Sequence, residues 1–249
     1  MNEPELRRRI GGGKEAEVFE YGQAALKLYR SGIPKRSAFR EAANLAIVEA
    51  YEVPGPRALG VRQIGERWGV IMTRIEGPSF ADALIDRPAA LQDYMNEMAR
   101  LHVVIHRHAA PLLAGLKVRL HGSILRATLL GSTRQRTLLN LLAEMPDGDQ
   151  LCHGDFHPLN VLGTSVNASI VDWLDATRGP PTADVCRSYL LMTHLDPAWA
   201  SSYIDAYAAE SSVSPDDILA WLPIIAGARL AEDVASEAEA LIAMVDAAR

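Results

Sequence analysis

The sequence predicts an α+β protein of two lobes: a small antiparallel β-sheet with one helix, then a larger, mainly helical lobe. Short apolar runs separated by glycine-containing turns fill residues 1–77. Apolar residues at helical spacing dominate residues 78–249. The segment Glu76-Gly77-Pro78 interrupts both patterns, so we place the domain boundary after residue 77.

In the first lobe, apolar runs at 17–21 and 24–29 flank a glycine turn, which predicts a β-hairpin. Two further strands are predicted at 58–61 and 68–75. Between the hairpin and these two strands, residues 37–51 predict a helix. Its apolar face is expected to consist of Phe39, Ala42, Ala43, Ala46 and Ile47.

In the second lobe, apolar stripes predict helices at 91–105 and 127–144. The residues Ser214-Pro215-Asp216-Asp217 predict a helix start, with Ser214 as the cap and proline in the first turn. The segment 152–170 differs from its surroundings because it mixes polar residues with short strand-like runs.

The composition excludes several classes of protein. Of 249 residues, 49% are hydrophobic and 22% charged, as in ordinary folded domains. The net charge of −6 argues against a nucleic-acid partner. Two cysteines cannot form a disulfide framework or a paired-cysteine metal site. We expect neither a signal peptide nor a membrane span, hence a cytoplasmic protein, and the oligomeric state is left open.

The residues that carry chemistry lie at 151–173. Residues 151–162 read Leu-Cys-His-Gly-Asp-Phe-His-Pro-Leu-Asn-Val-Leu, and Ile-Val-Asp-Trp ends at Trp173. Phosphoryl transfer needs oxygen ligands for Mg²⁺ and a separate carboxylate that orients the attacking hydroxyl. The five-residue step from Asp155 to Asn160 equals the step between the catalytic Asp and the metal-binding Asn of protein kinases, and Asp172 follows a short strand-like run.

This segment resembles the aminoglycoside phosphotransferase and choline kinase superfamily, whose signature is His-Gly-Asp-x-His-x-x-Asn followed by Ile/Val-Asp-Trp. Downstream, Gly-Pro-Pro-Thr-Ala-Asp-Val at 179–185 resembles that superfamily's Gly-Asp-Pro-x-x-Asp-Leu/Val stretch. The resemblance covers residues 11 to about 241 and implies a two-lobed, protein-kinase-like fold.

The resemblance implies a role for each matching residue. Asp155 would be the catalytic carboxylate, and Asn160 and Asp172 would bind Mg²⁺. ATP or GTP would be the phosphoryl donor, and the acceptor would be a hydroxyl of a small molecule.

Supporting roles are also implied within this stretch. His153 would be structural, Asp184 would be a buried residue that fixes the loop, and Trp173 would pack beneath Asp172. His157, which precedes a proline inside the loop, is expected to shape it.

The first lobe offers the other parts that a kinase needs. Gly12 and Gly13 would form the loop over the phosphates, Lys27 lies in a predicted strand, and Glu41 lies in the next helix to pair with it. Each residue also has a simpler interpretation. The glycines could be a flexible segment at the start of the fold, Lys27 could be a charge on an edge strand, and Glu41 could be a solvent-exposed helix residue.

The end of the last strand, at 71–77, resembles the linker between kinase lobes. Backbone groups at Thr73 and Ile75 would then meet the adenine. The alternative is an ordinary strand that ends at Gly77.

His102 and His106 share one helix face, because they are four residues apart. The zinc-protease motif needs Glu directly after the first His, and Val103 stands there instead. We therefore interpret His102, His106 and His108 as surface or packing histidines.

The predicted function is that of a small-molecule O-kinase. The alternatives are an idle nucleotide-binding module, and an atypical protein kinase, for which the twelve-position step from Asp172 to Asp184 leaves little room for an activation loop. Acids on the last helices could bind a polycationic acceptor or form a solvated face; they are Glu232, Asp233, Glu237, Glu239 and Asp246.

Overall fold

The computed structural model describes Leu6 and residues 8–247. They form two compact units. One unit contains the described part of 1–80 together with 159–175, and the other contains 81–158 and the described part of 176–249.

The segment 159–175 belongs to the first unit because of backbone hydrogen bonds. Gly163 N donates to Pro78 O at 2.9 Å, and Ile170 N donates to Pro54 O at 2.8 Å. The predicted domain boundary after residue 77 lies three residues before residue 80, where the chain first leaves this unit. The chain returns to the same unit at residues 159–175, so one boundary does not divide it into the two units.

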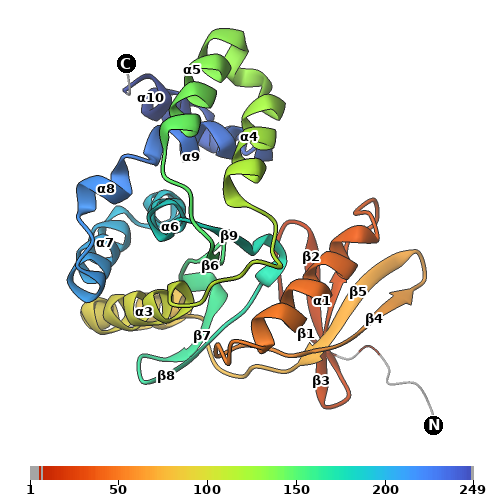
Figure 1. Cartoon of the computed structure of the whole chain (residues 1–249). Helices are drawn as coiled ribbons and strands as arrows, with labels where there is room; N and C mark the ends of the chain where they lie inside the picture. Colours follow the sequence, from red (N-terminus) through yellow and green to blue (C-terminus); the bar gives the residue numbers. More distant parts are fainter. Residues whose placement is uncertain (1–5, 7, 248–249) are drawn as a thin grey trace. The chain divides into compact units, whose positions relative to one another are not determined.

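The first unit contains an antiparallel sheet, as predicted (Figure 1). It has five strands, and the first of them, Arg9–Gly12, was not predicted. In spatial order its strands are β1 (Arg9–Gly12), β2 (Ala16–Tyr21), β3 (Ala24–Tyr29), β5 (Arg67–Thr73) and β4 (Ala58–Ile64). Lys27 of the central strand β3 pairs with Val18 on one side and Val70 on the other. Lys27 is therefore not an edge-strand charge.

Helix α1 (Arg36–Glu49) packs against β4 and β5 (Figure 1). The predicted apolar face of this helix was wrong. Phe39 is 52% exposed, and the buried side consists of Ala38, Glu41, Asn44, Leu45 and Val48. Two polar residues take core positions because the interior offers them hydrogen-bond partners, and an apolar pattern cannot reveal such a face.

The segment 159–175 folds into a short 3₁₀ turn (Pro158–Asn160), the hairpin of β7 (Val161–Thr164) and β8 (Asn167–Ile170), and a second turn (Trp173–Asp175). Asn44 of α1 donates to the carbonyls of Trp173 and Leu174 at 2.9 and 3.1 Å. These bonds explain why Asn44 is buried, and they fix the backbone that follows Asp172.

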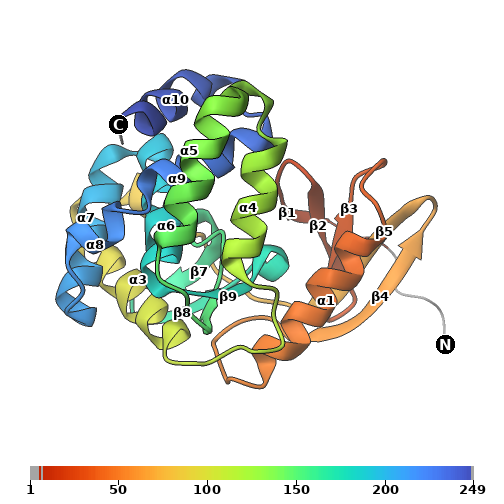
Figure 2. The ribbon, with the colours of Figure 1, turned by 45° about the horizontal axis from the view of Figure 1, so that its top comes forward.

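The second unit is mainly helical, as predicted. Its helices are α2 (Phe80–Asp86), α3 (Leu91–His106), α4 (Leu116–Arg126), α5 (Gly131–Glu144), α6 (Pro181–Leu195), α7 (Pro197–Ser211), α8 (Pro215–Leu219), α9 (Leu222–Arg229) and α10 (Ala238–Asp246). A two-stranded sheet joins β6 (Gln150–Cys152) to β9 (Thr177–Gly179). Helix α7 packs on α3 and α6, whereas α4 and α5 lie side by side against α9 (Figure 2).

Local sequence signals predicted some helix starts correctly and missed others. Ser214 caps α8 as expected, since its hydroxyl accepts from Asp216 N at 3.1 Å. The helix expected at 127–144 begins at Gly131, after a 3₁₀ turn. Both cysteines are buried and free. Among the described helices, none has the length and hydropathy needed to cross a bilayer.

Candidate active site

Lys27 lies at the centre of a buried ion cluster in the first unit. Its Nζ is 2.9 Å from Glu41 Oε1 and 2.6 Å from Asp172 Oδ1. Strand β3, helix α1 and the loop after β8 each supply one of these residues. The structure thus brings together three residues that the sequence singled out separately.

The cluster keeps Lys27 charged. Burial alone would lower the pKa of Lys27, but the carboxylates of Glu41 and Asp172 raise that pKa above its ordinary value. Glu41 is fully enclosed and also accepts a hydrogen bond from the Tyr29 hydroxyl. The side chain of Asp172 is 36% exposed, so this carboxylate faces solvent while it holds the lysine.

Asp172 and Asn160 lie on neighbouring stretches of backbone. Val171 N donates to Asn160 O at 2.9 Å, which ties the two predicted metal ligands together. Asp172 adopts a left-handed conformation, with φ of +66°, which Asp tolerates better than most residues. Trp173 is fully buried next to it and donates from Nε1 to Ile170 O at 3.1 Å.

Gly12 and Gly13 lie where β1 turns into β2. Gly13 N donates to Ala16 O at 2.9 Å, and Arg30 Nη2 donates to Gly13 O at 3.2 Å. This turn is short and hydrogen-bonded within itself. A contact of these glycines with nucleotide phosphates stays a prediction.

Thr73 is the last residue of β5, and its hydroxyl accepts from Arg57 N at 2.9 Å. Ile75 follows two residues later, outside regular secondary structure. The predicted contact of this segment with adenine is likewise still a prediction.

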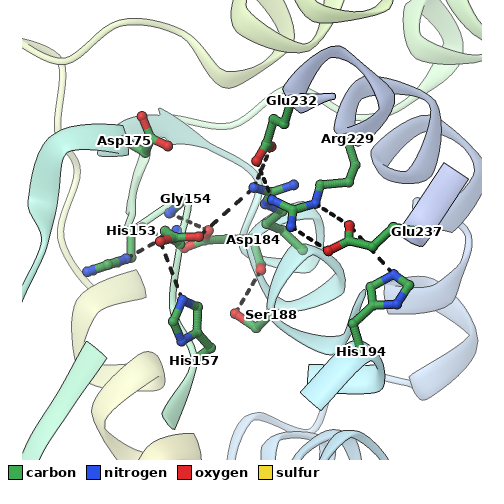
Figure 3. Close-up of polar contacts among 12 residues, drawn as sticks. His153, Gly154, His157, Asp175, Asp184, Ser188, His194, Arg229, Glu232 and Glu237 are labelled. Atoms are coloured by element: carbon green, nitrogen blue, oxygen red, sulfur yellow. Dashed lines mark hydrogen bonds and ion pairs between the residues drawn. The ribbon is translucent and has the colours of Figure 1, made fainter. Parts of the chain in front are cut away.

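In the second unit, Asp184 holds the loop that carries Asp155 (Figure 3). Its Oδ2 accepts from His153 N at 2.6 Å, and its Oδ1 accepts from Gly154 N at 2.8 Å. His153 Nδ1 in turn accepts from Asp155 N at 3.2 Å. Gly154 has φ of +80°, a conformation that glycine adopts without strain. The implied roles of His153 and Asp184 agree with these contacts.

His102 and His106 lie behind Asp184. Their Nε2 atoms are 2.9 and 3.4 Å from Asp184 Oδ2, and their Nδ1 atoms contact the hydroxyls of Tyr203 and Tyr207 at 2.5 and 2.8 Å. An ionised carboxylate only accepts, so the Nε2–H groups of both rings donate to Asp184. The same three groups could surround a cation, but these hydrogen bonds already use every ring nitrogen of the pair.

Burial sets the charges in this network. It lowers the pKa of His102 to about 3, so the ring is neutral at pH 7. Burial alone would raise the pKa of Asp184, but donation from His102 and His106 holds that pKa well below its ordinary value. The network therefore places the neutral ring of His102 against one ionised acceptor, Asp184. The interpretation of His102 and His106 as surface or packing histidines did not include these hydrogen bonds to Asp184, although their four-residue spacing indicated a shared helix face.

Asp155 is flanked by two nitrogen-bearing side chains. His157 Nε2 is 3.4 Å from its Oδ2, and Arg187 Nη2 is 4.0 Å from its Oδ1. Burial would raise the pKa of Asp155, but His157 and Arg187 hold it below its ordinary value, so the carboxyl group is ionised.

A family model described as "Phosphotransferase enzyme family" matches residues 7–217 of this chain. The chain belongs to this family. No curated protein matches the sequence.

Solved aminoglycoside phosphotransferases have the same fold as this family member. The aminoglycoside-3'-phosphotransferase of type VIII is 16% identical, with a TM-score of 0.68 over 93% of this chain and 94% of that one. A thermostable mutant of APH(4)-Ia, in complex with ADP and hygromycin B, is 15% identical, with a TM-score of 0.69 over 96% and 90%. APH(3'')-Id from Streptomyces rimosus, in complex with ADP and streptomycin, is 17% identical, with a TM-score of 0.62 over 85% and 90%.

Arg187, which lies 4.0 Å from Asp155, was not singled out from the sequence. It lies on α6, three residues after Asp184, and so about one helical turn along the same helix. That spacing was the available signal. A basic residue one turn from the loop-fixing aspartate is a candidate to reach the same loop.

Proposed function

We propose that this chain transfers the γ-phosphoryl group of ATP or GTP to a hydroxyl of a small molecule, such as an aminoglycoside, another amino alcohol or a metabolite. The observation that carries the proposal is the bonding of Lys27 to both Glu41 and Asp172. A kinase needs this lysine, paired with a helix carboxylate, to hold nucleotide phosphates.

The residues of the first unit fit a magnesium nucleotide. Asp172 and Asn160 offer a carboxylate and an amide oxygen, which are ligands that Mg²⁺ prefers. When bound, Mg²⁺ would neutralise charge on the phosphates. Lys27, held in place by Glu41, would bind a phosphate oxygen.

Asp155 would act on the acceptor. Its carboxylate is ionised and lies on a backbone that Asp184 fixes, so it can accept a hydrogen bond from an incoming hydroxyl and take its proton. A positioned carboxylate needs little strength as a base here, because the proton leaves late in phosphoryl transfer and positioning dominates the rate.

The solved structures of similar fold support this proposal for both substrates. Members of that group were solved with ADP or AMP-PNP, and with hygromycin B or streptomycin. Their fold therefore accommodates an adenine nucleotide and a small hydroxylated acceptor.

The structure argues against a protein kinase with a docking loop. Between Asp172 and Asp184 the chain forms a 3₁₀ turn, strand β9 and the first turn of α6. Strand β9 is paired with β6. Regular structure thus occupies the segment in which a protein kinase carries its activation loop.

Replacement of Lys27 by Met is expected to lower nucleotide turnover by about 10²-fold or more, because it removes a preorganised cation from the phosphate site. The measurement is Mg²⁺-dependent consumption of ATP and of GTP by purified protein, with nucleotide affinity determined in parallel.

Arg67→Met is a matched control in the same sheet. Arg67 donates to Tyr29 O, Leu28 O and Glu17, so this change also removes a partly buried, hydrogen-bonded cation. It should cost stability and leave turnover within a few-fold. Equal turnover losses in both variants would contradict a phosphate role for Lys27.

A further inference from the structure

Two arginines of the second unit share one carboxylate. Arg187 of α6 donates from Nη2 to Glu232 Oε1 at 2.6 Å. Arg229, at the end of α9, donates from Nη1 to the other oxygen of Glu232 (Figure 3). The arginine side chains are 12% and 13% exposed, whereas that of Glu232 is 42% exposed. We call these three residues the arginine clamp. Its carboxylate is the part most accessible to solvent.

The clamp lies next to the catalytic carboxylate. Arg187 Nη2, which holds Glu232, is also 4.0 Å from Asp155 Oδ1. An acceptor hydroxyl must bind within about 3 Å of Asp155 to give up its proton. The remainder of a small acceptor then lies within reach of Arg187.

Arg229 is itself fixed from the other side. Its Nε and Nη2 donate to the two oxygens of Glu237 at 2.7 and 2.8 Å. This bidentate pair orients the guanidinium and leaves Nη1 to face Glu232. Arg229 is thereby held in position before any ligand arrives.

These pairs change the interpretation of the acids on the last helices. Glu232 and Glu237 are engaged by Arg187 and Arg229, and Asp246 is engaged by Arg134 at 2.7 and 2.9 Å. Three of the five acids that could have bound a polycation are therefore already neutralised. Displacement of Glu232 would free one hydrogen-bonding edge on each of Arg187 and Arg229, and an anionic group of an acceptor could take that place.

We propose that Arg187 and Arg229 recognise a carboxylate or phosphate group on the acceptor, and that Glu232 occupies their binding position until the acceptor displaces it. The carboxylate of Glu232 shows that an anion fits between the two guanidinium groups. Glu232 lies in the short 3₁₀ turn Leu230–Glu232, and its long side chain can turn toward solvent without unfolding a helix. This inference deepens the proposed kinase function and rests on it.

The test uses acceptors that differ in one anionic group: glycerol against glycerate and against glycerol 3-phosphate, ethanolamine against serine, and glucose against glucuronate. We expect transfer to favour the anionic members. Arg187→Met should raise KM for them by about 10²-fold, as expected for loss of one partner of a desolvated charge pair. Glu232→Gln should lower KM for them several-fold, because the carboxylate that competes with the acceptor is gone.

Asp246→Asn is the matched control. It removes the carboxylate of another arginine pair of the second unit, and we expect it to change neither kinetic constant. Transfer to neutral or polycationic acceptors, with KM insensitive to Arg187→Met and Glu232→Gln, would overturn the inference and leave the kinase proposal intact.

A binding measurement separates the two proposals if no acceptor is phosphorylated. Titration of Glu232→Gln with glycerate and with inorganic phosphate should show saturable binding that a second change, Arg187→Met, removes. Absence of such Arg187-dependent binding would refute the clamp as an anion site, whether or not the chain proves to be a kinase.

Discussion

Asp155→Asn is expected to lower acceptor phosphorylation by about 10³-fold, the usual range for loss of a positioned general base. Asn keeps the size of the side chain and can still contact a hydroxyl, but it cannot take the proton. The measurement is the single-turnover rate of phosphoryl transfer at saturating nucleotide.

This variant should fold and bind nucleotide as the parent does, because the backbone N–H of Asp155, which donates to His153, remains. Asp147→Asn changes an exposed carboxylate of the same unit, which pairs with Lys117 at the surface, and should leave the rate unchanged. A residual rate within ten-fold of the parent, in a folded Asp155→Asn protein, would show that another group is the base.

Asp184→Asn is expected to lower the free energy of unfolding by about 3–5 kcal/mol, as for one partner removed from a buried ionic network. In the parent, the two carboxylate oxygens accept from His153 N–H, Gly154 N–H and two imidazoles. Asn replaces one of these oxygens by an NH2 group, which cannot accept, so at least one donor loses its acceptor. Urea unfolding, followed by circular dichroism, measures this loss.

The pH dependence of the loss identifies its cause. Because the folded pKa of Asp184 is depressed, its contribution to stability is complete above the unfolded value of about 3.9 and disappears as pH falls below it. The difference in free energy of unfolding between the parent and Asp184→Asn should therefore be constant from pH 7 to 5, and it should become smaller only at lower pH.

Asp175→Asn provides the comparison for this second prediction. Asp175 forms a surface pair with Arg40 at 3.7 Å, and such pairs contribute about 0–1 kcal/mol. If Asp184→Asn costs no more than Asp175→Asn, the buried network does not hold the loop in the way that its hydrogen bonds indicate.

Sequence spacing predicted the residues that sit in short, chemically constrained loops. The step from Asp155 to Asn160 matches the kinase pattern, Asp172 follows a short strand, and Lys27 and Glu41 occur in the order that a kinase lobe needs. For Lys27, Glu41 and Asp172 the structure supplies the contact itself, which joins positions up to 145 residues apart.

Local pattern could not predict features that depend on distant partners. The buried face of α1 carries Glu41 and Asn44, whose partners lie in other elements, so hydrophobic periodicity selected the wrong side of the helix. The pairing of Arg187 with Glu232 likewise joins α6 to the turn after α9. Neither Arg187 nor Arg229 stands out in the sequence, because charged residues occur along the other helices as well.

The most direct test of the account is transfer of the terminal phosphoryl group of ATP or GTP to a small hydroxylated acceptor, with parent and Asp155→Asn proteins side by side. The acceptor panel contains the anionic pairs above together with aminoglycosides, choline and thiamine, and mass spectrometry identifies the product. We predict one phosphorylated acceptor class, formed by the parent and lost in the variant. Nucleotide binding without transfer to any acceptor, or transfer of the phosphoryl group to a protein, would contradict the account.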